Sequence, residues 1–227
     1  MLKFPKSPSI SGVIIAQDEE QFISAAINNI YNVVNEIVIL DGGSEDQTVK
    51  VVKDFPDPQQ KIRLFRNTFG GHIGDQKNTA LSKVRGVWSL LIDCDETLEP
   101  KLLEMIPRFV TTNKYECYAI SRINLINGVK TDVYPDYQLR LFRSFCRWVK
   151  APHEENCGWK DYKMLCLEGE GYHIIHNKTS DRQGVQDARY DVIKKAKLNM
   201  GDGEIVLESD FWDNHNYRDF GRLNIEG

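Results

Sequence analysis

The stretch Val87-Trp88-Ser89-Leu90-Leu91-Ile92-Asp93-Cys94-Asp95-Glu96 joins a mostly apolar run to three carboxylates. An apolar run of this length predicts a strand that is buried on both faces, and ligands of open α/β sheets gather beyond the carboxyl ends of such strands. Carboxylates at that edge need a compensating cation, and Mg²⁺ or Mn²⁺ is commonly held by one or two carboxylates together with substrate phosphate oxygens. The stretch therefore predicts a divalent metal site and a phosphorylated substrate. The alternative is a solvated turn that caps a helix expected at residues 98–109.

The composition of the chain excludes several classes of protein. Its 227 residues, 41% hydrophobic and 27% charged, are expected to form one domain with one sizeable core. A formal net charge of −4 argues against a nucleic-acid-binding protein that depends on neutralising phosphates. The five cysteines lack a CxxC spacing, and the chain shows neither a signal peptide nor a membrane-spanning run. We therefore expect a cytoplasmic protein, with peripheral docking on the inner face of a membrane left open.

Apolar runs and helical patterns alternate from residue 10 to about residue 109, as they do in βαβ units. The expected strands are residues 12–16, 36–40, 61–65 and 87–92, and the expected helices are residues 18–31, 48–55 and 75–84. Four such strands joined by right-handed crossovers predict a parallel sheet of the nucleotide-binding type.

The second half has short strands and aromatic residues between charges. Strands are expected at residues 115–126, 138–143, 165–167 and 172–176, with Asn127-Gly128 as a hairpin turn. A helix is expected at residues 185–200, followed by a polar tail.

Four stretches of the first half, in this order, resemble motifs of the family 2 glycosyltransferases: residues 13–20, 39–48, 77–81 and 88–96. Residues 136–143 and 152–154 look like motifs of the subgroup that includes the lipopolysaccharide core glucosyltransferases. The resemblance implies an α/β fold of the GT-A type, with a Rossmann-like, mostly parallel sheet. It divides a single domain, residues 1–227, into a nucleotide-sugar-binding half at 8–112, a smaller mixed acceptor half at 113–200 and the tail at 201–227.

The same resemblance implies the chemistry. We expect a metal-dependent, inverting transfer of a sugar from a UDP-, GDP- or dTDP-linked donor to a hydroxyl group of a saccharide or glycoconjugate acceptor. Such a reaction belongs to polysaccharide, lipopolysaccharide or glycoconjugate synthesis. A divalent ion, Mn²⁺ or Mg²⁺, would neutralise the departing diphosphate as a Lewis acid.

The resemblance also assigns residues to the donor. Ala16 and Glu19 correspond to backbone contacts with the nucleoside, and Asp41 corresponds to the residue that recognises the nucleobase. Taken without the resemblance, Asp41 is also typical of an Asx turn that shapes the following loop. Lys77 corresponds to a basic residue near the diphosphate, and the alternative for it is a solvated helix face.

The metal and the ribose are assigned to the acidic stretch. Asp93 corresponds to the residue that faces the ribose or the water shell of the metal, Asp95 corresponds to a direct metal ligand, and Cys94 lies between them in the donor site. Alternation along the strand at 172–176 puts His173 and His176 on opposite faces. His176 is the candidate for a further metal ligand, and the alternative is an ordinary surface histidine.

An inverting enzyme also needs a general base for the acceptor hydroxyl. The catalytic candidates are Glu154, which we favour because His153-Glu154 resembles a pair of the subgroup, and Asp136, which could instead hold Arg140 or the acceptor. Arg140 and Arg143 are placed by the resemblance beside the acceptor or the diphosphate, and surface charge is the alternative for Arg143.

Other functions also fit parts of the sequence. Residues 93–98 differ only at Glu96 from the Asp-x-Asp-Gly-Thr-Leu motif of haloacid-dehalogenase-type phosphatases, but that motif follows a first strand and here it follows a fourth. Sugar-nucleotide nucleotidyltransferases carry a glycine-rich loop where this chain has Asp18-Glu19-Glu20. A non-catalytic carbohydrate-binding domain of the same fold is the third alternative.

Overall fold

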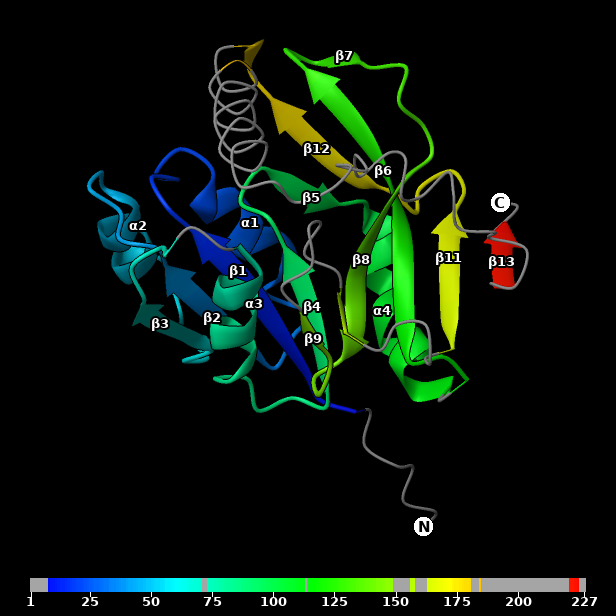
Figure 1. Ribbon diagram of the computed structural model, residues 1–227, viewed down its shortest axis with the longest axis horizontal. Helices are drawn as coiled ribbons and strands as arrows, with labels where there is room; N and C mark the ends of the chain where they lie inside the picture. The colour runs from blue at the N-terminus through cyan, green and yellow to red at the C-terminus, as the bar shows by residue number, and fades with distance from the viewer. Residues whose placement is uncertain are drawn as a thin grey trace, which may run out of the picture.

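The computed structural model describes residues 8–70, 73–112, 114–148, 156–157, 163–180, 184 and 221–224. Its first half is built on the parallel strands β1 (Ile10–Ala16), β2 (Glu36–Asp41), β3 (Ile62–Arg66) and β4 (Trp88–Ile92). These strands lie in the order β4-β1-β2-β3 (Figure 1). Strand order reverses between β1 and β4, as it does in doubly wound nucleotide-binding sheets. The parallel sheet expected from the sequence is confirmed.

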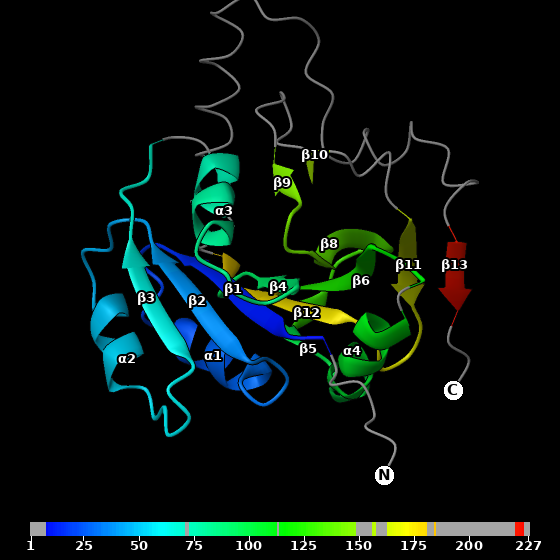
Figure 2. The same ribbon diagram turned by 90° about the horizontal axis from the view of Figure 1, so that it is seen from below.

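Helices cover both faces of this sheet. The connecting helices are α1 (Ile23–Ile30), α2 (Thr48–Asp54) and α3 (Ile73–Leu81). Figure 2 shows α3 on one face and α1 and α2 on the other. Every residue of β4 is buried, so the apolar run before the acids forms a strand covered on both sides, as expected.

The second half extends the same sheet with mixed strands. Its strands are β6 (Cys117–Ile126), β8 (Asp136–Arg143), β11 (Met164–Glu168) and β13 (Gly221–Asn224). The order continues from β4 as β8-β6-β11-β13, and β8 runs antiparallel to both β4 and β6. A small separate sheet pairs β9 (Arg147–Trp148) with β10 (Asn156–Cys157). The expected contrast between a parallel first half and a mixed second half is therefore confirmed.

Two further strands enclose the end of β4. The short strand β5 (Glu96–Leu98) pairs with β12 (Ile174–Lys178), and β12 also runs parallel to the end of β6. The hairpin after β6 leads through Asn127 and Gly128 into β7 (Val129–Lys130). Both turn residues have positive φ, 50° and 78°, as the expected Asn-Gly turn requires.

The helix α4 (Pro100–Thr112) packs under the second half through an apolar stripe. Its buried residues, Leu102, Ile106, Phe109 and Val110, recur at helical spacing. The sequence pattern predicted that this helix begins at residue 98, but it begins at Pro100. The reason is that residues 96–98 pair with β12 as a strand. A pairing partner that lies about 75 residues further along the chain leaves no local signal.

The first helix also begins later than expected, at Ile23. Asp18 has a φ of 57°, outside the helical range, and its carboxylate accepts a hydrogen bond from the N–H of Glu45 at 2.8 Å. In the same way, Glu20 accepts one from the N–H of Gln47 at 2.8 Å. These acids join the β1–α1 loop to the β2–α2 loop and do not form the first turn of a helix.

None of the helices in the described ranges is long and apolar enough to cross a membrane. The helix expected at residues 185–200 lies outside these ranges, and so do Glu154 and most of the tail, whereas residues 221–224 of the tail form β13.

A buried carboxylate joins three strands at the edge of the sheet opposite the acids. Glu36 accepts hydrogen bonds from Ser11 Oγ at 2.7 Å and from Arg63 Nη1 at 2.6 Å. Burial would raise the pKa of Glu36, but the hydrogen bonds from Ser11 and Arg63 outweigh it and hold the pKa below its ordinary value. The N–H of Gly86 donates to Ser11 Oγ at 2.8 Å, which attaches the loop before β4 to the same network.

We expect Gly86→Ala to destabilise the protein by about 1–3 kcal/mol, the usual cost of overpacking. A Cβ at this position would lie 2.6 Å from Ser11 Oγ and 2.7 Å from the backbone nitrogen of Ser11. Gly70→Ala is the matched control, since no atom lies within 4 Å of its added Cβ. Urea unfolding of the two variants measures the difference, and equal free energies of unfolding would contradict the expectation.

We expect Glu36→Gln to lower the free energy of unfolding at pH 7 by about 2 kcal/mol, the scale of a hydrogen bond to a charged group. The pKa of Glu36 is lower in the folded than in the unfolded state, so its contribution is complete above the unfolded pKa of about 4.3 and is lost as the pH falls through the folded pKa. The difference between wild type and variant should therefore shrink from pH 6 towards pH 3. A difference that stays constant or grows towards acid pH would refute this account.

Candidate functional site

The carboxyl ends of β1, β2 and β4 meet at one edge of the sheet and bring most of the expected donor residues together. Ala16 at the end of β1 is paired with Asp41 at the end of β2. Cys94, just past β4, contacts the carbonyl oxygen of Ile15 through its sulfur at 3.6 Å. Parallel strands end at a common edge, so residues about 25 to 80 positions apart in the chain become neighbours here.

Asp41 is 1% exposed, and its two carboxylate oxygens have different surroundings. Oδ1 accepts a hydrogen bond from the N–H of Ser44 at 3.0 Å, which is the expected Asx turn. Oδ2 is buried and accepts no hydrogen bond from any residue that the structure describes. Its charged neighbour is the exposed side chain of Arg66, whose Nε lies 3.5 Å away. One oxygen of Asp41 thus shapes the loop, and the other makes no hydrogen bond within the described residues.

The backbone groups assigned to the nucleoside are used in the loop itself. The carbonyl oxygen of Ala16 accepts the N–H of Gly42 at 2.7 Å, and the N–H of Glu19 donates to Thr48 Oγ1 at 2.7 Å. Lys77, on α3, places its Nζ 5.0 Å from the ring centroid of Trp148. Lys77 therefore lies where α3 meets β9.

A fully buried carboxylate organises the acidic stretch. Glu96 is 0% exposed and accepts hydrogen bonds from Arg140 Nε at 3.0 Å, Arg140 Nη2 at 2.7 Å and Arg122 Nη1 at 3.0 Å. Burial would raise the pKa of Glu96, but the charges of Arg140 and Arg122 hold it below its ordinary value. Arg140 Nη2 also lies 2.5 Å from Asp93 Oδ2. Glu96 is therefore an internal counter-ion, and the acids do not cap α4, because the strand β5 separates them from the start of that helix at Pro100.

A bulge in β8 directs Arg140 towards the acids. Along the pairing of β6 with β8, Tyr118 faces Leu141 and the next residue, Ala119, faces Leu139. Arg140 is the extra residue between them, and β-bulges commonly redirect a side chain next to a functional site. Arg140 thus lies beside Asp93 and Glu96, and its expected contact with the acceptor or the diphosphate stays a prediction.

The structure corrects the placement of Arg143. This residue pairs with Trp88 at the start of β4, and its guanidinium carbon lies 4.4 Å from the Trp88 ring centroid. Asp93 follows the other end of β4, five residues after Trp88 and so roughly 17 Å away at about 3.3 Å per residue. Arg143 is thus stacked on a core tryptophan away from the acids, as the alternation of the short strand alone could not show.

Asp136, one of the two candidates for the general base, is held by several donors. Oδ2 accepts hydrogen bonds from Arg122 Nε and Asn124 Nδ2, both at 2.8 Å, and Oδ1 accepts one from Gln138 Nε2 at 2.7 Å. Burial would raise the pKa of Asp136, but the charge of Arg122 and these hydrogen bonds lower it. A general base works best with a pKa near the operating pH, so Asp136 is poorly suited to that role. Its partner in the structure is Arg122 where the sequence suggested Arg140.

The two metal-ligand candidates that are most distant in the sequence come together. His176 Nε2 lies 3.3 Å from Asp95 Oδ2, and both side chains are buried. The pairing of β5 with β12 sets His176 opposite Glu96, next to Asp95 in the chain. On the other side of the ring, Nδ1 lies 2.7 Å from Asn124 Oδ1. His176 is therefore not a surface histidine.

Acidic groups outnumber basic ones among the ion pairs of the described part of this site. Four carboxylates, those of Asp93, Asp95, Glu96 and Asp136, lie beside the two guanidiniums of Arg122 and Arg140 and the imidazole of His176. Among the described residues no cluster of three or more His, Cys, Asp or Glu side chains is arranged to hold a metal. A carboxylate and an imidazole nevertheless fit Mn²⁺ or Mg²⁺, which complete their shells with water and phosphate oxygens.

Two of these groups, Arg122 and Asn124, were not singled out in the sequence. They lie two residues apart on β6, so alternation puts both side chains on one face. The available signal for them was a charged and an amide side chain inside a mostly apolar strand. Their partners lie on β5, β8 and β12, so the sequence of β6 alone does not identify them.

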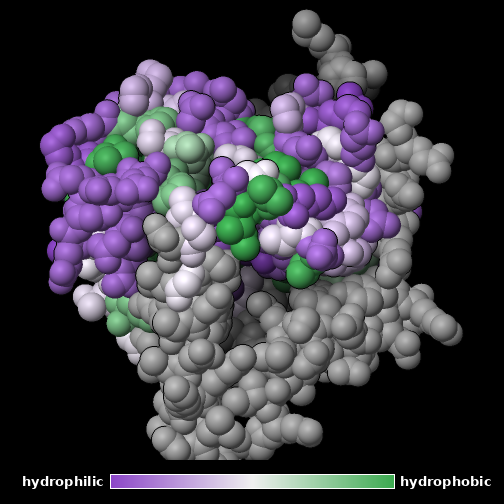
Figure 3. All heavy atoms as spheres, turned by 90° about the horizontal axis from the view of Figure 1, so that it is seen from above, coloured by the Kyte–Doolittle hydropathy of each residue, from purple (hydrophilic) through white to green (hydrophobic). Residues whose placement is uncertain are grey.

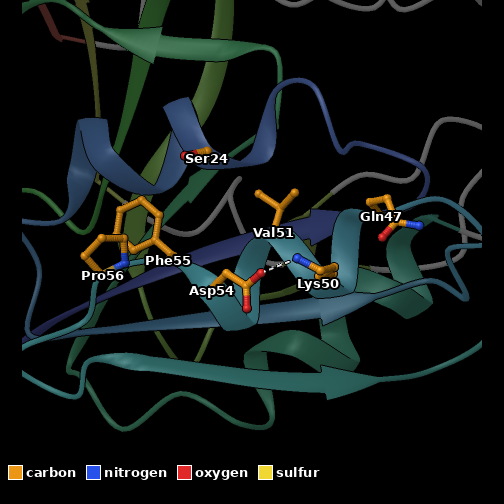
Figure 4. Close-up of a pocket in the computed structure, with 7 residues that line it drawn as sticks. All are labelled: Ser24, Gln47, Lys50, Val51, Asp54, Phe55 and Pro56. Atoms are coloured by element: carbon orange, nitrogen blue, oxygen red, sulfur yellow. Dashed lines mark hydrogen bonds and ion pairs between the residues drawn. The ribbon is translucent and has the colours of Figure 1, made fainter.

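One hollow on the surface lies elsewhere. It has a volume of about 370 Å³ between α1 and α2 and includes the ion pair of Lys50 with Asp54 (Figure 4). A second hollow of about 220 Å³ is lined by the loop acids Asp18, Glu20 and Asp46. Neither contains a residue of the Glu96 network, so the candidate site is identified by its charges and not by concavity.

The hairpin near the site exposes apolar side chains. Val129 and Val133 are 70% and 62% exposed, and Tyr134 is also exposed. In Figure 3, which views the molecule from above, hydrophobic residues gather in the middle of the coloured part of the face, between mostly hydrophilic residues.

Comparison with known proteins agrees with this geometry. Residues 11–160 match the model of the family described as Glycosyl transferase family 2. An uncharacterized glycosyltransferase of Rickettsia felis is 30% identical over 225 residues, covering 89% of this chain and 76% of that protein. The lipopolysaccharide core biosynthesis glycosyltransferase LpsC of Rhizobium meliloti is 34% identical over 109 residues, covering 48% of this chain and 39% of that protein.

Solved structures share the fold at low sequence identity. S. aureus TarS 1–349 in complex with UDP-GlcNAc has a TM-score of 0.60 at 16% identity, covering 75% of this chain and 58% of that one. The mannosyltransferase PcManGT from Pyrobaculum calidifontis in complex with GDP-Man and Mn²⁺ has a TM-score of 0.58 at 14% identity, covering 74% and 56%. This chain thus spans less than two thirds of either solved chain. These matches confirm the expected GT-A fold, and the family match excludes a haloacid-dehalogenase-type phosphatase. The chain belongs to the family 2 glycosyltransferases and is a glycosyltransferase.

Proposed function

We propose that this chain is a metal-dependent, inverting glycosyltransferase that moves a sugar from a nucleoside-diphosphate sugar to a hydroxyl group of a saccharide or glycoconjugate. The observation that carries this proposal is the approach of His176 Nε2 to Asp95 Oδ2, 3.3 Å, beside the acidic groups Asp93 and Glu96. The printed descriptions of TarS with UDP-GlcNAc and of PcManGT with GDP-Man and Mn²⁺ support it.

The residues of the cluster divide the work of donor binding. Asp95 and His176 would hold Mn²⁺ or Mg²⁺, which supplies Lewis-acid neutralisation of the leaving diphosphate when bound. Asp93 is 45% exposed at its side chain and is held by Arg140 at 2.5 Å, which suits a carboxylate that faces the ribose or a metal-bound water. Cys94 and Lys77 complete the proposed donor site from the loop after β4 and from α3.

Glu154 is the proposed general base for the acceptor hydroxyl. It lies outside the described residues, and the support for it is indirect. The rival carboxylate, Asp136, accepts hydrogen bonds from Arg122, Asn124 and Gln138 and has a lowered pKa. A carboxylate that is stabilised in this way has little tendency to take a proton from a hydroxyl group.

The nucleobase of the donor is proposed to be uracil or thymine. Of the two carboxylate oxygens of Asp41, Oδ1 accepts the N–H of Ser44, and Oδ2 accepts no hydrogen bond within the described part of the chain. One carboxylate oxygen matches the single imide N–H of uracil or thymine, whereas guanine presents two adjacent donors. Cytosine and adenine can donate only from an exocyclic amino group, beside a ring-nitrogen acceptor that a carboxylate, which only accepts, cannot pair with. Arg66, 3.5 Å from Oδ2, is placed to donate to a carbonyl beside the imide.

The cellular setting is a further part of the proposal. The printed name of LpsC supports a reaction in lipopolysaccharide or other glycoconjugate synthesis. Cys94, Cys117, Cys146 and Cys166 are buried and form no disulfide within the described residues, which supports the reducing cytoplasm expected from the sequence. Peripheral contact with a membrane and a single domain over residues 1–227 stay predictions.

Asp95→Asn and His176→Ala should abolish the metal-dependent stabilisation of the protein by UDP. For the wild type, Mn²⁺ and UDP at about 100 times their dissociation constant should add about 2.7 kcal/mol to the free energy of unfolding. Thermal unfolding with UDP alone, Mn²⁺ alone and both together measures the effect. Asp132→Asn is the control, because this aspartate is exposed and lies outside the cluster. Full retention of the shift by Asp95→Asn would rule out the proposed metal site.

Calorimetric titration in the presence of Mn²⁺ should show tighter binding of UDP and dTDP than of GDP, CDP or ADP. In Asp41→Asn the amide oxygen keeps the Ser44 N–H and the amide nitrogen replaces Oδ2, so a donor faces the base. The preference for UDP over CDP should then fall by about tenfold or more, the scale of one hydrogen bond to a charged group. Asp54→Asn, exposed on α2, is the control. GDP binding as tightly as UDP, or an unchanged UDP-to-CDP ratio in Asp41→Asn, would overturn the assignment.

A further inference from the structure

A chain of hydrogen bonds runs from Asp136 through Asn124 to His176. Asn124 Nδ2 donates to Asp136 Oδ2 at 2.8 Å, and His176 Nδ1 lies 2.7 Å from Asn124 Oδ1. The strands fix this contact, because β12 runs parallel to β6 with His176 directly opposite Asn124. The arrangement is therefore part of the sheet and does not depend on loop conformation.

The orientation of the Asn124 amide follows from its neighbour. An ionised carboxylate only accepts hydrogen bonds, and Arg122 and Gln138 donate to the same carboxylate of Asp136. The amide nitrogen of Asn124 must therefore face Asp136, which turns its carbonyl oxygen towards His176. An oxygen at that place requires a proton on Nδ1 of the histidine.

The other ring nitrogen then carries a lone pair. In a neutral imidazole one nitrogen donates and the other accepts, so protonation at Nδ1 leaves Nε2 without a proton. Nε2 lies 3.3 Å from Asp95 Oδ2. Two electron-rich atoms at this separation favour a cation between or beside them. His176 is 6% exposed, so the packed ring has little freedom to turn and exchange its two nitrogens.

We propose that Asn124 and Asp136 are positioning residues, which set the tautomer of His176 and direct its Nε2 towards a divalent cation bound by Asp95. This inference rests on the proposed metal-dependent function and extends it to two residues that do not touch the metal. Partners of this kind fix the orientation of metal-binding histidines, and their loss commonly weakens metal binding by about 10–100-fold. This role requires Asp136 to stay ionised throughout, whereas a general base must take up a proton during the reaction.

The tautomer can be measured on the metal-free wild-type protein. Long-range ¹H–¹⁵N correlation spectra of ¹⁵N-histidine-labelled protein, recorded at a pH where the ring is neutral, distinguish a proton on Nδ1 from one on Nε2. The His176 signals are assigned by their absence in His176→Gln. We expect Nδ1–H to predominate in the wild type. Predominance of Nε2–H would overturn the inference, whether or not the protein binds a metal.

Metal affinity provides the second measurement. In the presence of UDP, Asn124→Ala should bind Mn²⁺, followed by electron paramagnetic resonance, about 10–100-fold more weakly than the wild type. Asn177→Ala is the matched control: Asn177 is exposed next to His176 and contributes only its backbone N–H to the carbonyl oxygen of Asp95, at 3.0 Å. Its affinity for Mn²⁺ should stay within about twofold of the wild type. Thermal unfolding of both variants shows that a weaker affinity does not come from unfolding.

The outcomes separate this inference from the function on which it rests. Wild-type affinity for Mn²⁺ in a folded Asn124→Ala variant overturns the positioning role and leaves the metal site intact. Absence of Mn²⁺ binding by the wild type in the presence of UDP overturns the metal site. The tautomer of His176 measured without metal then decides whether Asn124 and Asp136 orient the ring.

Discussion

The buried carboxylate of Glu96 is the constraint on which the site depends. It is inaccessible to water and accepts hydrogen bonds from Arg140 and Arg122. A buried charge without partners would cost several kcal/mol, so these two arginines must enter the space beyond β4. Each arginine also forms an ion pair with a second acid: Arg140 with Asp93, and Arg122 with Asp136. One buried charge thus sets the positions of four others.

The approach of Asp95 to His176 next to this network links the structure to the proposed function. His176 Nε2 lies 3.3 Å from Asp95 Oδ2, and both side chains are buried. Family membership identifies the chain as a glycosyltransferase, and a substrate diphosphate would add further negative charge at the same edge. The proposed divalent cation would compensate the protein carboxylates and the substrate phosphates together. The guanidiniums of Arg122 and Arg140 would then stay paired with carboxylates of the protein.

Several particular residues show how far the sequence could predict this arrangement. The strands β1 to β4 follow from apolar runs that need no partner to be recognised, and the Asn127-Gly128 turn follows from its local backbone preference. The start of α4 was missed because residues 96–98 are held by β12. The acceptors of Arg122 and the stacking of Arg143 on Trp88 depend on the register of β8, which includes a bulge that no periodicity predicts.

By itself, the sequence determined the alternation of buried strands with amphipathic helices, the parallel strands of the first half and the carboxylates placed after β4. These features depend on local patterns of apolar and polar residues. Only the tertiary structure decided which charges meet. Asp95 and His176 are about 80 residues apart, and their approach depends on the antiparallel pairing of β5 with β12. The division of the acids into an internal counter-ion, a held carboxylate and a carboxylate beside a histidine is a property of burial and distance. No single stretch of the chain contains that information.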